Sequence, residues 1–340
     1  MTTIRTAALL AGAVFTLHAG AVTTRYVAKD LGAPPAGRVA YPTGLNDSGQ
    51  VVGYVVDLST STFTSFATGP QGRQVFDPCP RISTTDCRAV GIDAAGDVVT
   101  TMTLSNGLSV SAASAIDGTG LHYLHGVSGG FNTATGVSSS GLVTGLVFND
   151  QGLAVGDRGS VDGRRPRTIG RVSGRAINDS GVAVGGSIVI NNQPSQAVMS
   201  VPGNAPQSLG FLPGGSFSTA TAISNDGWIV GYAFNADAAS HATLARLGTP
   251  GLTDLGALES GGWSNAHGVN DAGIVTGIDA APDGTARAFV LDTRDLVMTD
   301  LNTLVTLPAG VVLSDAVAIN TSGQIAAEGS DGHAYLLTPR

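Results

Sequence analysis

The stretch AHGVNDAGIVTG, residues 266–277, decides the fold of this chain because six further stretches repeat its pattern. Each copy has two small residues spaced by one position, an aliphatic residue, then Asn, Asp or Ser, and a glycine three positions later. These glycines lie 40 to 50 residues apart, and they are Gly49, Gly96, Gly141, Gly181, Gly227, Gly273 and Gly323. A period of that length, with short strands and glycine turns, is typical of the blades of a β-propeller.

Each repeat predicts four β-strands. In the copy quoted above, they cover residues 266–269, 274–278, 287–291 and 296–301. The turn between the first two strands begins with Asn270 and ends with Gly273. An Asn, Asp or Ser side chain can accept a hydrogen bond from its own turn, and glycine adopts the positive φ that the turn needs.

The first strand of each repeat has one small face and one large face. The small residues two positions before the turn are Gly44, Gly91, Gly136, Ala176, Ala222, Gly268 and Ala318. The aliphatic residues that follow them are Leu45, Ile92, Val137, Ile177, Ile223, Val269 and Ile319. Stacked sheets need this complementarity, so we place these positions on the crowded innermost strands, where one blade's aliphatic residues fill the space beside its neighbour's small ones.

The two ends of the repeat region complement one another. Residues 30–46 align without gaps on residues 254–270, so the chain begins with a fourth strand that lacks the first three. After the last turn the chain provides only two more strands, and the missing one is the fourth. We therefore predict an all-β fold, a seven-bladed β-propeller with four-stranded blades, its last blade closed by the N-terminal strand. A β-helix is the alternative, and it predicts no complementary ends.

The N-terminus has the pattern of a secretory signal peptide over residues 1–21. Arg5 is followed by an apolar run over residues 7–17, and Ala19-Gly20-Ala21 fits a cleavage site. An uncleaved anchor is the alternative. We expect residues 22–340 to form a single propeller of seven repeats of about 46 residues. In an exported protein the close pair Cys79 and Cys87 predicts a local disulfide.

Composition narrows the choice of partners. The formal charge is −8 and 12% of residues are charged, which argues against nucleic acid because that ligand requires a basic footprint. No segment after the first has the ~20 apolar residues of a membrane-spanning helix. Each acidic turn offers one carboxylate, too few for calcium, so we predict no metal. No cofactor motif is present, and we expect a monomer.

The repeats resemble the HAF-type extracellular repeat family of bacteria, which is named for a His-Ala-Phe tripeptide. The corresponding tripeptides are His333-Ala334-Tyr335, Arg287-Ala288-Phe289 and His241-Ala242-Thr243, together with Thr253-Asp254-Leu255-Gly256 and the repeated turn. The resemblance covers essentially the whole mature chain. It implies an exported bacterial repeat protein and no particular chemistry.

The candidate binding residues occupy the positions where the repeat varies and is polar. Five positions before the turn stand Tyr41, Arg88, Asn265 and Asp315, and three positions before it stand Arg175 and His267. In a propeller we expect both rows near the mouth of the axial channel, where converging polar groups are the default binding site. A solvated channel lining without a ligand is the alternative.

No catalytic motif accompanies these residues. The sequence therefore favours a secreted or periplasmic, non-enzymatic scaffold whose ligand is a glycan or an envelope protein. Two other functions stay open. One is an extracytoplasmic lyase or hydrolase with its site at the channel mouth, and the other is a surface-structural or adhesive protein.

Overall fold

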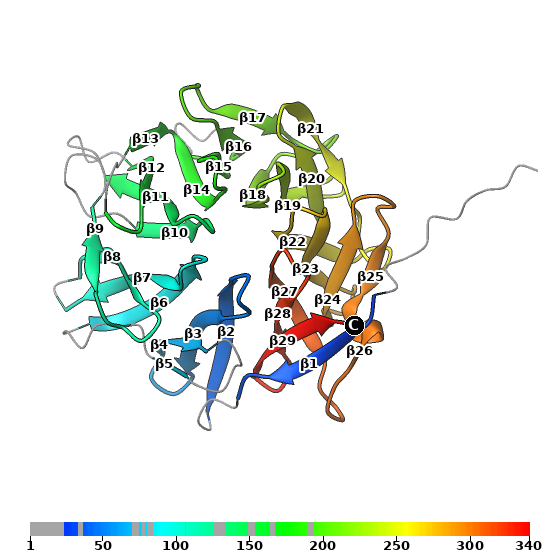
Figure 1. Cartoon of the computed structure of the whole chain (residues 1–340). Helices are drawn as coiled ribbons and strands as arrows, with labels where there is room; N and C mark the ends of the chain where they lie inside the picture. The colour runs from blue at the N-terminus through cyan, green and yellow to red at the C-terminus, as the bar shows by residue number, and fades with distance from the viewer. Residues whose placement is uncertain are drawn as a thin grey trace, which may run out of the picture.

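Seven twisted β-sheets stand around one axis in the computed structural model of the protein (Figure 1). The structure describes residues 24–32, 37–69, 75–76, 79, 84–105, 107–125, 133–148, 154–163, 167–188 and 194–340. The expected signal peptide lies outside these residues. Within a blade, neighbouring strands pair antiparallel, and the strand that directly precedes the repeated turn is the innermost. The predicted seven-bladed propeller is confirmed.

Blades 1 to 3 follow in chain order from the N-terminal side. Blade 1 comprises β2 (Arg38–Leu45), β3 (Val51–Asp57), β4 (Thr62–Thr68) and β5 (Val75–Phe76). Blade 2 comprises β6 (Thr84–Ile92), β7 (Asp97–Leu104), β8 (Ser109–Ala115) and β9 (His122–Leu124). Blade 3 comprises β10 (Thr133–Val137), β11 (Leu142–Phe148), β12 (Ala154–Ser160) and β13 (Arg167–Gly170).

Blades 4 to 6 repeat this arrangement. Blade 4 comprises β14 (Val172–Ile177), β15 (Ala183–Ser187), β16 (Ala197–Ser200) and β17 (Gln207–Gly210). Blade 5 comprises β18 (Ser218–Ile223), β19 (Trp228–Phe234), β20 (Ser240–Arg246) and β21 (Thr249–Asp254). Blade 6 comprises β22 (Trp263–Val269), β23 (Ile274–Ala280), β24 (Ala286–Asp292) and β25 (Met298–Asp300).

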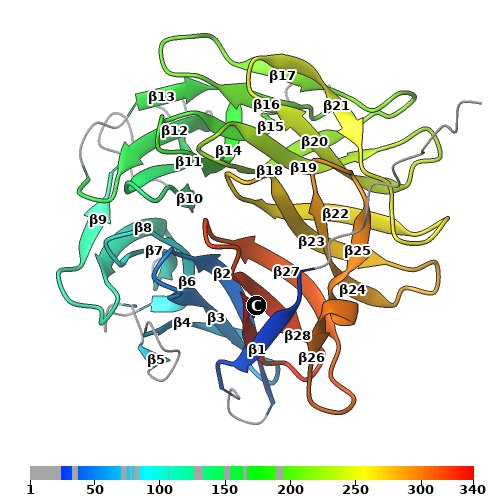
Figure 2. The ribbon, with the colours of Figure 1, turned by 45° about the vertical axis from the view of Figure 1, so that its right-hand side comes forward.

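Blade 7 is built from both ends of the chain. Its inner strands are β27 (Leu313–Ile319), β28 (Ile325–Gly329) and β29 (Ala334–Pro339), and β1 (Tyr26–Asp30) pairs antiparallel with β29 along its full length. Figures 1 and 2 show blue β1 beside red β29. The predicted closure is thus confirmed. The structure adds a short outer strand, β26 (Val305–Thr306), which follows the 3₁₀ helix η2 (Leu301–Leu304) and pairs parallel with β1.

A repeated contact between a histidine and an aspartate fixes the closing strand to its neighbour. His333, the residue directly before β29, lies 2.9 Å from Asp30, measured from Nδ1 to the carboxylate, so this contact joins the two ends of the chain. Blade 5 contains the same contact between His241 and Asp254, also at 2.9 Å. Both aspartates also accept a hydrogen bond from the backbone N–H of a glycine two residues later. The histidine of the repeat signature therefore joins the third strand of a blade to its fourth.

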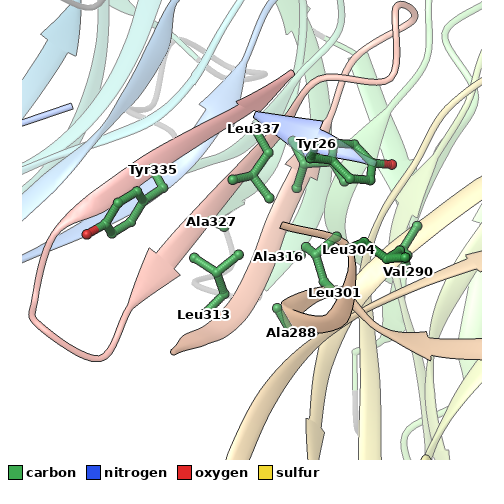
Figure 3. Packing of buried hydrophobic residues seen from close by; sticks show 11 residues of the cluster. Tyr26, Ala288, Val290, Leu301, Leu304, Leu313, Ala316, Ala327, Tyr335 and Leu337 are labelled. Carbon is green, nitrogen blue, oxygen red and sulfur yellow. The ribbon is translucent and has the colours of Figure 1, made fainter. Parts of the chain in front are cut away.

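Apolar packing supports the same closure. Tyr26 of β1 is buried in the same apolar cluster as Leu313 and Leu337 of blade 7, and the cluster continues through Leu301 and Val290 toward blade 6 (Figure 3). Burying large apolar side chains on both sides of the seam contributes about 1.5–3 kcal/mol for each. The closing strand is thus part of a core rather than an added edge.

The small face of each inner strand lies against the next blade. A Cβ atom added at Gly44 would lie 2.9 Å from the Cα of Gly91, and one added at Gly91 would lie 2.7 Å from Val137. At Gly136 the nearest atom would be the carbonyl oxygen of Arg175, at 2.5 Å. Neighbouring inner strands therefore touch almost backbone to backbone at Gly44 and Gly136, whereas the predicted contact with a neighbouring aliphatic side chain is found at Gly91.

The repeated turns form a hydrogen-bonded ring at one end of the axis, which we call the turn end. Asn46 accepts a bond from the N–H of Gln50 in its own turn and donates to the carbonyl of Asp93 in the next blade. At the seam, Asn320 donates in the same way to the carbonyl of Asn46. Other interfaces use different donors, such as the N–H of Asp226 bonded to Asp271. The acidic turn residues therefore take part in blade-to-blade packing.

The disulfide predicted from the sequence joins Cys79 to Cys87, whose Cα atoms are 6.3 Å apart. Cys87 lies on β6 and is 3% exposed, so the bridge ties the segment before blade 2 to its innermost strand.

The close contact at Gly136 predicts a specific loss of stability in the variant Gly136→Ala. The added methyl group would meet backbone atoms of blade 4 that cannot rotate away, so we expect a decrease of about 1–3 kcal/mol in the free energy of unfolding. Chemical denaturation monitored by circular dichroism measures it. The control is Ala222→Gly, at the equivalent position of blade 5, which costs at most about 1 kcal/mol. Equal stability of Gly136→Ala and the wild type would contradict the close packing.

Candidate functional site

Every inner strand contains a β-bulge three positions before the turn residue. The register between the first and second strands shifts there in all seven blades, for example between Pro42 and Gly44 and between Ala266 and Gly268. The skipped residues are Thr43, Val90, Thr135, Arg175, Thr221, His267 and Val317. A bulge redirects a side chain relative to a regular strand. We call these seven positions the bulge row.

The bulge row lines a cavity on the propeller axis with a volume of about 210 Å³. A second cavity, of about 170 Å³, lies on the turn side and is lined by turn residues such as Asn46 and Asn320. Five of the seven inner-strand aliphatic residues predicted above line both cavities: Leu45, Ile92, Val137, Val269 and Ile319. The channel therefore has an aliphatic waist between a turn end and an opposite end, which we call the mouth.

Three threonines of the bulge row make hydrogen bonds between neighbouring blades. Thr43 donates to the carbonyl of Ala89 at 2.9 Å, and Thr221 donates to the carbonyl of Ala266 at 2.6 Å. Thr135 makes the equivalent bond to blade 4. Each bond joins one inner strand to the next. Of the seven bulge residues, only Arg175 and His267 carry ionisable groups.

Arg175 is the bulge residue with a free cationic group. Its side chain is exposed and borders the axial cavity. Among the described residues, its guanidinium makes no hydrogen bond or ion pair. A guanidinium presents five donors in a planar fork suited to carboxylates and phosphates. Arg175 can therefore bind an anionic or acceptor-rich group that enters from the mouth.

His267 belongs to a titratable cluster shared by blades 6 and 7. Its Nδ1 lies 3.0 Å from Asp315 on β27, with side chains 27% and 13% exposed respectively. Glu328 on β28 stands directly across from Asp315 in the strand register. Two carboxyl groups and an imidazole therefore lie together beside the mouth.

Burial and mutual repulsion set the protonation of this cluster. Burial, reinforced by the negative charge of Asp315, raises the pKa of Glu328 to about 8. Burial alone would lower the pKa of His267, but the hydrogen bond and charge of Asp315 outweigh it and hold that pKa above its ordinary value. At neutral pH, Glu328 is therefore a protonated acid beside the carboxyl group of Asp315.

Tyr41 and Arg88 lie in an aromatic cluster between blades 1 and 2. The ring of Tyr41 stacks on that of Tyr54 with centroids 5.4 Å apart. The guanidinium of Arg88 lies 3.6 Å from the centroid of Phe63 and pairs with Asp86 at 2.9 Å. A cation over an aromatic face is attracted by the ring quadrupole, so Arg88 bridges two blades.

The structure separates the six predicted site residues into four places. His267 and Asp315 meet in the titratable cluster, and Tyr41 and Arg88 meet in the aromatic cluster. Asn265 accepts a hydrogen bond from Ser240 of blade 5. Arg175 and His267 line the axial cavity, whereas the row of Tyr41, Arg88, Asn265 and Asp315 lies outside its lining. Their ligand-binding role stays a prediction.

The sequence reasoning missed Glu328. It pairs across from Asp315 on the second strand, in a row otherwise formed by Tyr54, Thr101, Leu146, Gly186, Tyr232 and Ile278. A single carboxylate in a row of neutral residues is the signal that could have identified it.

Comparison with known proteins supports the fold alone. No family model matches the chain, and no curated protein matches it. The structure is similar to oligogalacturonate lyase from Vibrio parahaemolyticus, with a TM-score of 0.60 at 10% identity, covering 94% of this chain and 98% of that one. It is also similar to YCF48, solved bound to D1 peptide, with a TM-score of 0.57 at 10% identity and coverages of 92% and 95%.

A third similar structure is TolB from Acinetobacter baumannii, with a TM-score of 0.50 and 12% identity. The match covers 77% of this chain and 63% of TolB, so the chain spans less than two thirds of that protein. These likenesses define the class as a β-propeller. In the described part of the chain, no helix has the length and apolar character needed to cross a bilayer.

The raised pKa of Glu328 predicts a pH-dependent cost in stability. The native state keeps the Glu328 proton up to about pH 8, whereas the unfolded chain loses it near pH 4.5. The contribution of Glu328 to the free energy of unfolding is therefore fully present below pH 4.5 and is lost as pH rises to 8. The wild type should therefore lose unfolding free energy between pH 5 and pH 8. We expect Glu328→Gln to lose about 1–2 kcal/mol less over the same range, a figure that includes screening by solvent at this partly exposed group.

Denaturation of both proteins at the two pH values provides the measurement. Glu259→Gln is the matched control, because Glu259 is exposed and pairs with Arg287 at the surface. We expect the control to keep the wild-type pH dependence. If Glu328→Gln keeps it too, Glu328 does not hold its proton in the folded protein.

Proposed function

We propose that this protein is an exported, non-enzymatic β-propeller that binds an extracytoplasmic ligand at the mouth of its axial channel. The observation that carries the proposal is Arg175. A β-bulge redirects this arginine to the edge of the axial cavity, and no described residue satisfies its guanidinium. Unpaired donors of this kind acquire their hydrogen bonds from water or from a ligand.

The volume of the axial cavity limits the size of a ligand group that can enter it. The aliphatic waist lies between the turn-side cavity and the cavity lined by the bulge row, and the latter has a volume of about 210 Å³. That volume suits a side chain or a single sugar-sized group rather than a folded segment. The ligand is therefore the exposed end of a glycan or of an envelope protein, with an acceptor-rich group against Arg175.

Export is supported by two features of the chain. The N-terminal sequence has the charge and hydrophobic pattern of a signal peptide, and Cys79 and Cys87 form a disulfide. The pairing of His241 with Asp254 and of His333 with Asp30 gives the HAF-type signature a structural role. We infer from it that the chain is a repeat protein of that bacterial type.

An enzymatic function is the second candidate, and Glu328 favours it. A carboxylic acid with a pKa of about 8 can donate a proton at neutral pH. Such a group suits a general acid in a lyase or hydrolase. One similar propeller is by name an oligogalacturonate lyase. The cluster lies beside the mouth, so substrate and ligand would enter by the same route.

Binding measurements distinguish the two candidates. The protein spanning residues 22–340 is applied to arrays of neutral and acidic oligosaccharides and of peptides with acidic ends. We expect binding to at least one acidic group, and Arg175→Gln should weaken it at least tenfold because the charge-assisted bonds are lost. The control is Arg294→Gln, an arginine that is 82% exposed and pairs with Asp292.

Turnover of the bound compounds is measured on the same samples. Binding without turnover supports the scaffold. Turnover that Glu328→Gln abolishes while binding persists supports the enzyme. Equal binding by wild type and Arg175→Gln would contradict the proposed channel site.

A further inference from the structure

Basic residues are concentrated in one part of the chain. The sequence contains 17 lysines and arginines, and six of them are arginines between positions 158 and 175. The chain as a whole carries a formal charge of −8, so this local excess runs against the overall composition. Local fields of this kind attract anions.

Two of these arginines lie directly opposite each other on the outer strands of blade 3. Arg158 on β12 is paired in register with Arg167 on β13. Like charges on directly opposed cross-strand residues destabilise a sheet. Burial, together with the positive charge of Arg167, lowers the pKa of Arg158. The pair therefore has an electrostatic cost in the protein alone.

Both arginines line one cavity between blades 3 and 4. Its volume is about 450 Å³, and its other lining residues are Leu142, Gly159, Ser160, Asp162, Gly181 and Pro202. The Arg158 guanidinium donates to the carbonyl of Gly181 at 2.9 Å. Arg167 is exposed and has no hydrogen bond or ion pair among the described residues. One carboxylate, Asp162, which accepts a hydrogen bond from Ser160, shares the cavity with two guanidiniums.

We propose that this cavity is a binding site for an oxyanion carried on a sugar-sized molecule. A phosphate or carboxylate between the two guanidiniums would accept bonds from both and relieve their repulsion. The cavity is larger than an isolated phosphate requires, and Leu142 and Pro202 give it an apolar wall against which a sugar ring packs. The site is separate from the axial channel and does not depend on the function proposed there.

Arg167 is the residue to test because it holds no structural bond. Calorimetric titration of residues 22–340 at low salt uses four probes: glucose 6-phosphate, glucuronate, inorganic phosphate and glucose. We expect one or both anionic sugars to bind and glucose not to bind. Arg167→Gln should weaken the anionic sugar at least tenfold, and Arg167→Lys should weaken it less. Affinity should fall as salt is raised.

Melting curves without ligand separate binding from folding. Arg167→Gln should melt at or above the wild-type temperature, because the substitution removes the repulsion with Arg158. Arg294→Gln should bind the probes as the wild type does. Arg175→Gln should keep the binding step that Arg167→Gln loses, which distinguishes this site from the channel. Tighter binding of glucose 6-phosphate would identify the ligand class as phosphorylated sugars. Tighter binding of glucuronate would identify it as sugar acids. Failure of all anionic probes to bind, or equal binding by Arg167→Gln, would overturn the proposal.

Discussion

The whole structure depends on how closely neighbouring inner strands approach around the axis. Seven blades can share one axis only if each innermost strand carries almost no side chain where it meets the next. Gly44, Gly91 and Gly136 meet that condition with separations that a methyl group would violate. Blade 6 has a fourth glycine, Gly268, and blades 4, 5 and 7 use alanine, so the requirement is strict in part of the ring and relaxed in the rest. The ring of turn-to-turn hydrogen bonds and the closing strand hold this spacing.

The same constraint explains where function can lie. A strand that packs on both faces has few positions for a polar group, and the repeated β-bulge provides one in each blade. Three of the seven positions are used for blade-to-blade bonds by threonine. At two other positions of the bulge row, a titratable or charged residue, His267 or Arg175, stands in place of threonine. The two proposed binding sites thus use a bulge that packing leaves unused and the outer strands, where Arg158 and Arg167 lie.

Much of this architecture could be predicted from the sequence because it repeats. The seven turns, the small row, the complementary ends and the Cys79–Cys87 bridge each rest on local patterns, and the structure confirms them. The bulges could not be predicted, because one extra residue in a strand changes the pairing without changing composition. Glu328 and the stacking of Arg88 on Phe63 were missed because they arise between strands or blades. Contacts at that level depend on register, which a single sequence specifies only in part.

The central claim is that β1 is an integral strand of blade 7, so that the two ends of the chain close one cooperative ring. Native-state hydrogen exchange of residues 22–340, followed by mass spectrometry, tests it directly. The account predicts that the β1 amides bonded to β29 exchange as slowly as those of β28, through global unfolding of the ring. Exchange of the β1 amides orders of magnitude faster than β28, with the other blades still protected, would show that the ring stands without its N-terminal strand and would contradict the closure.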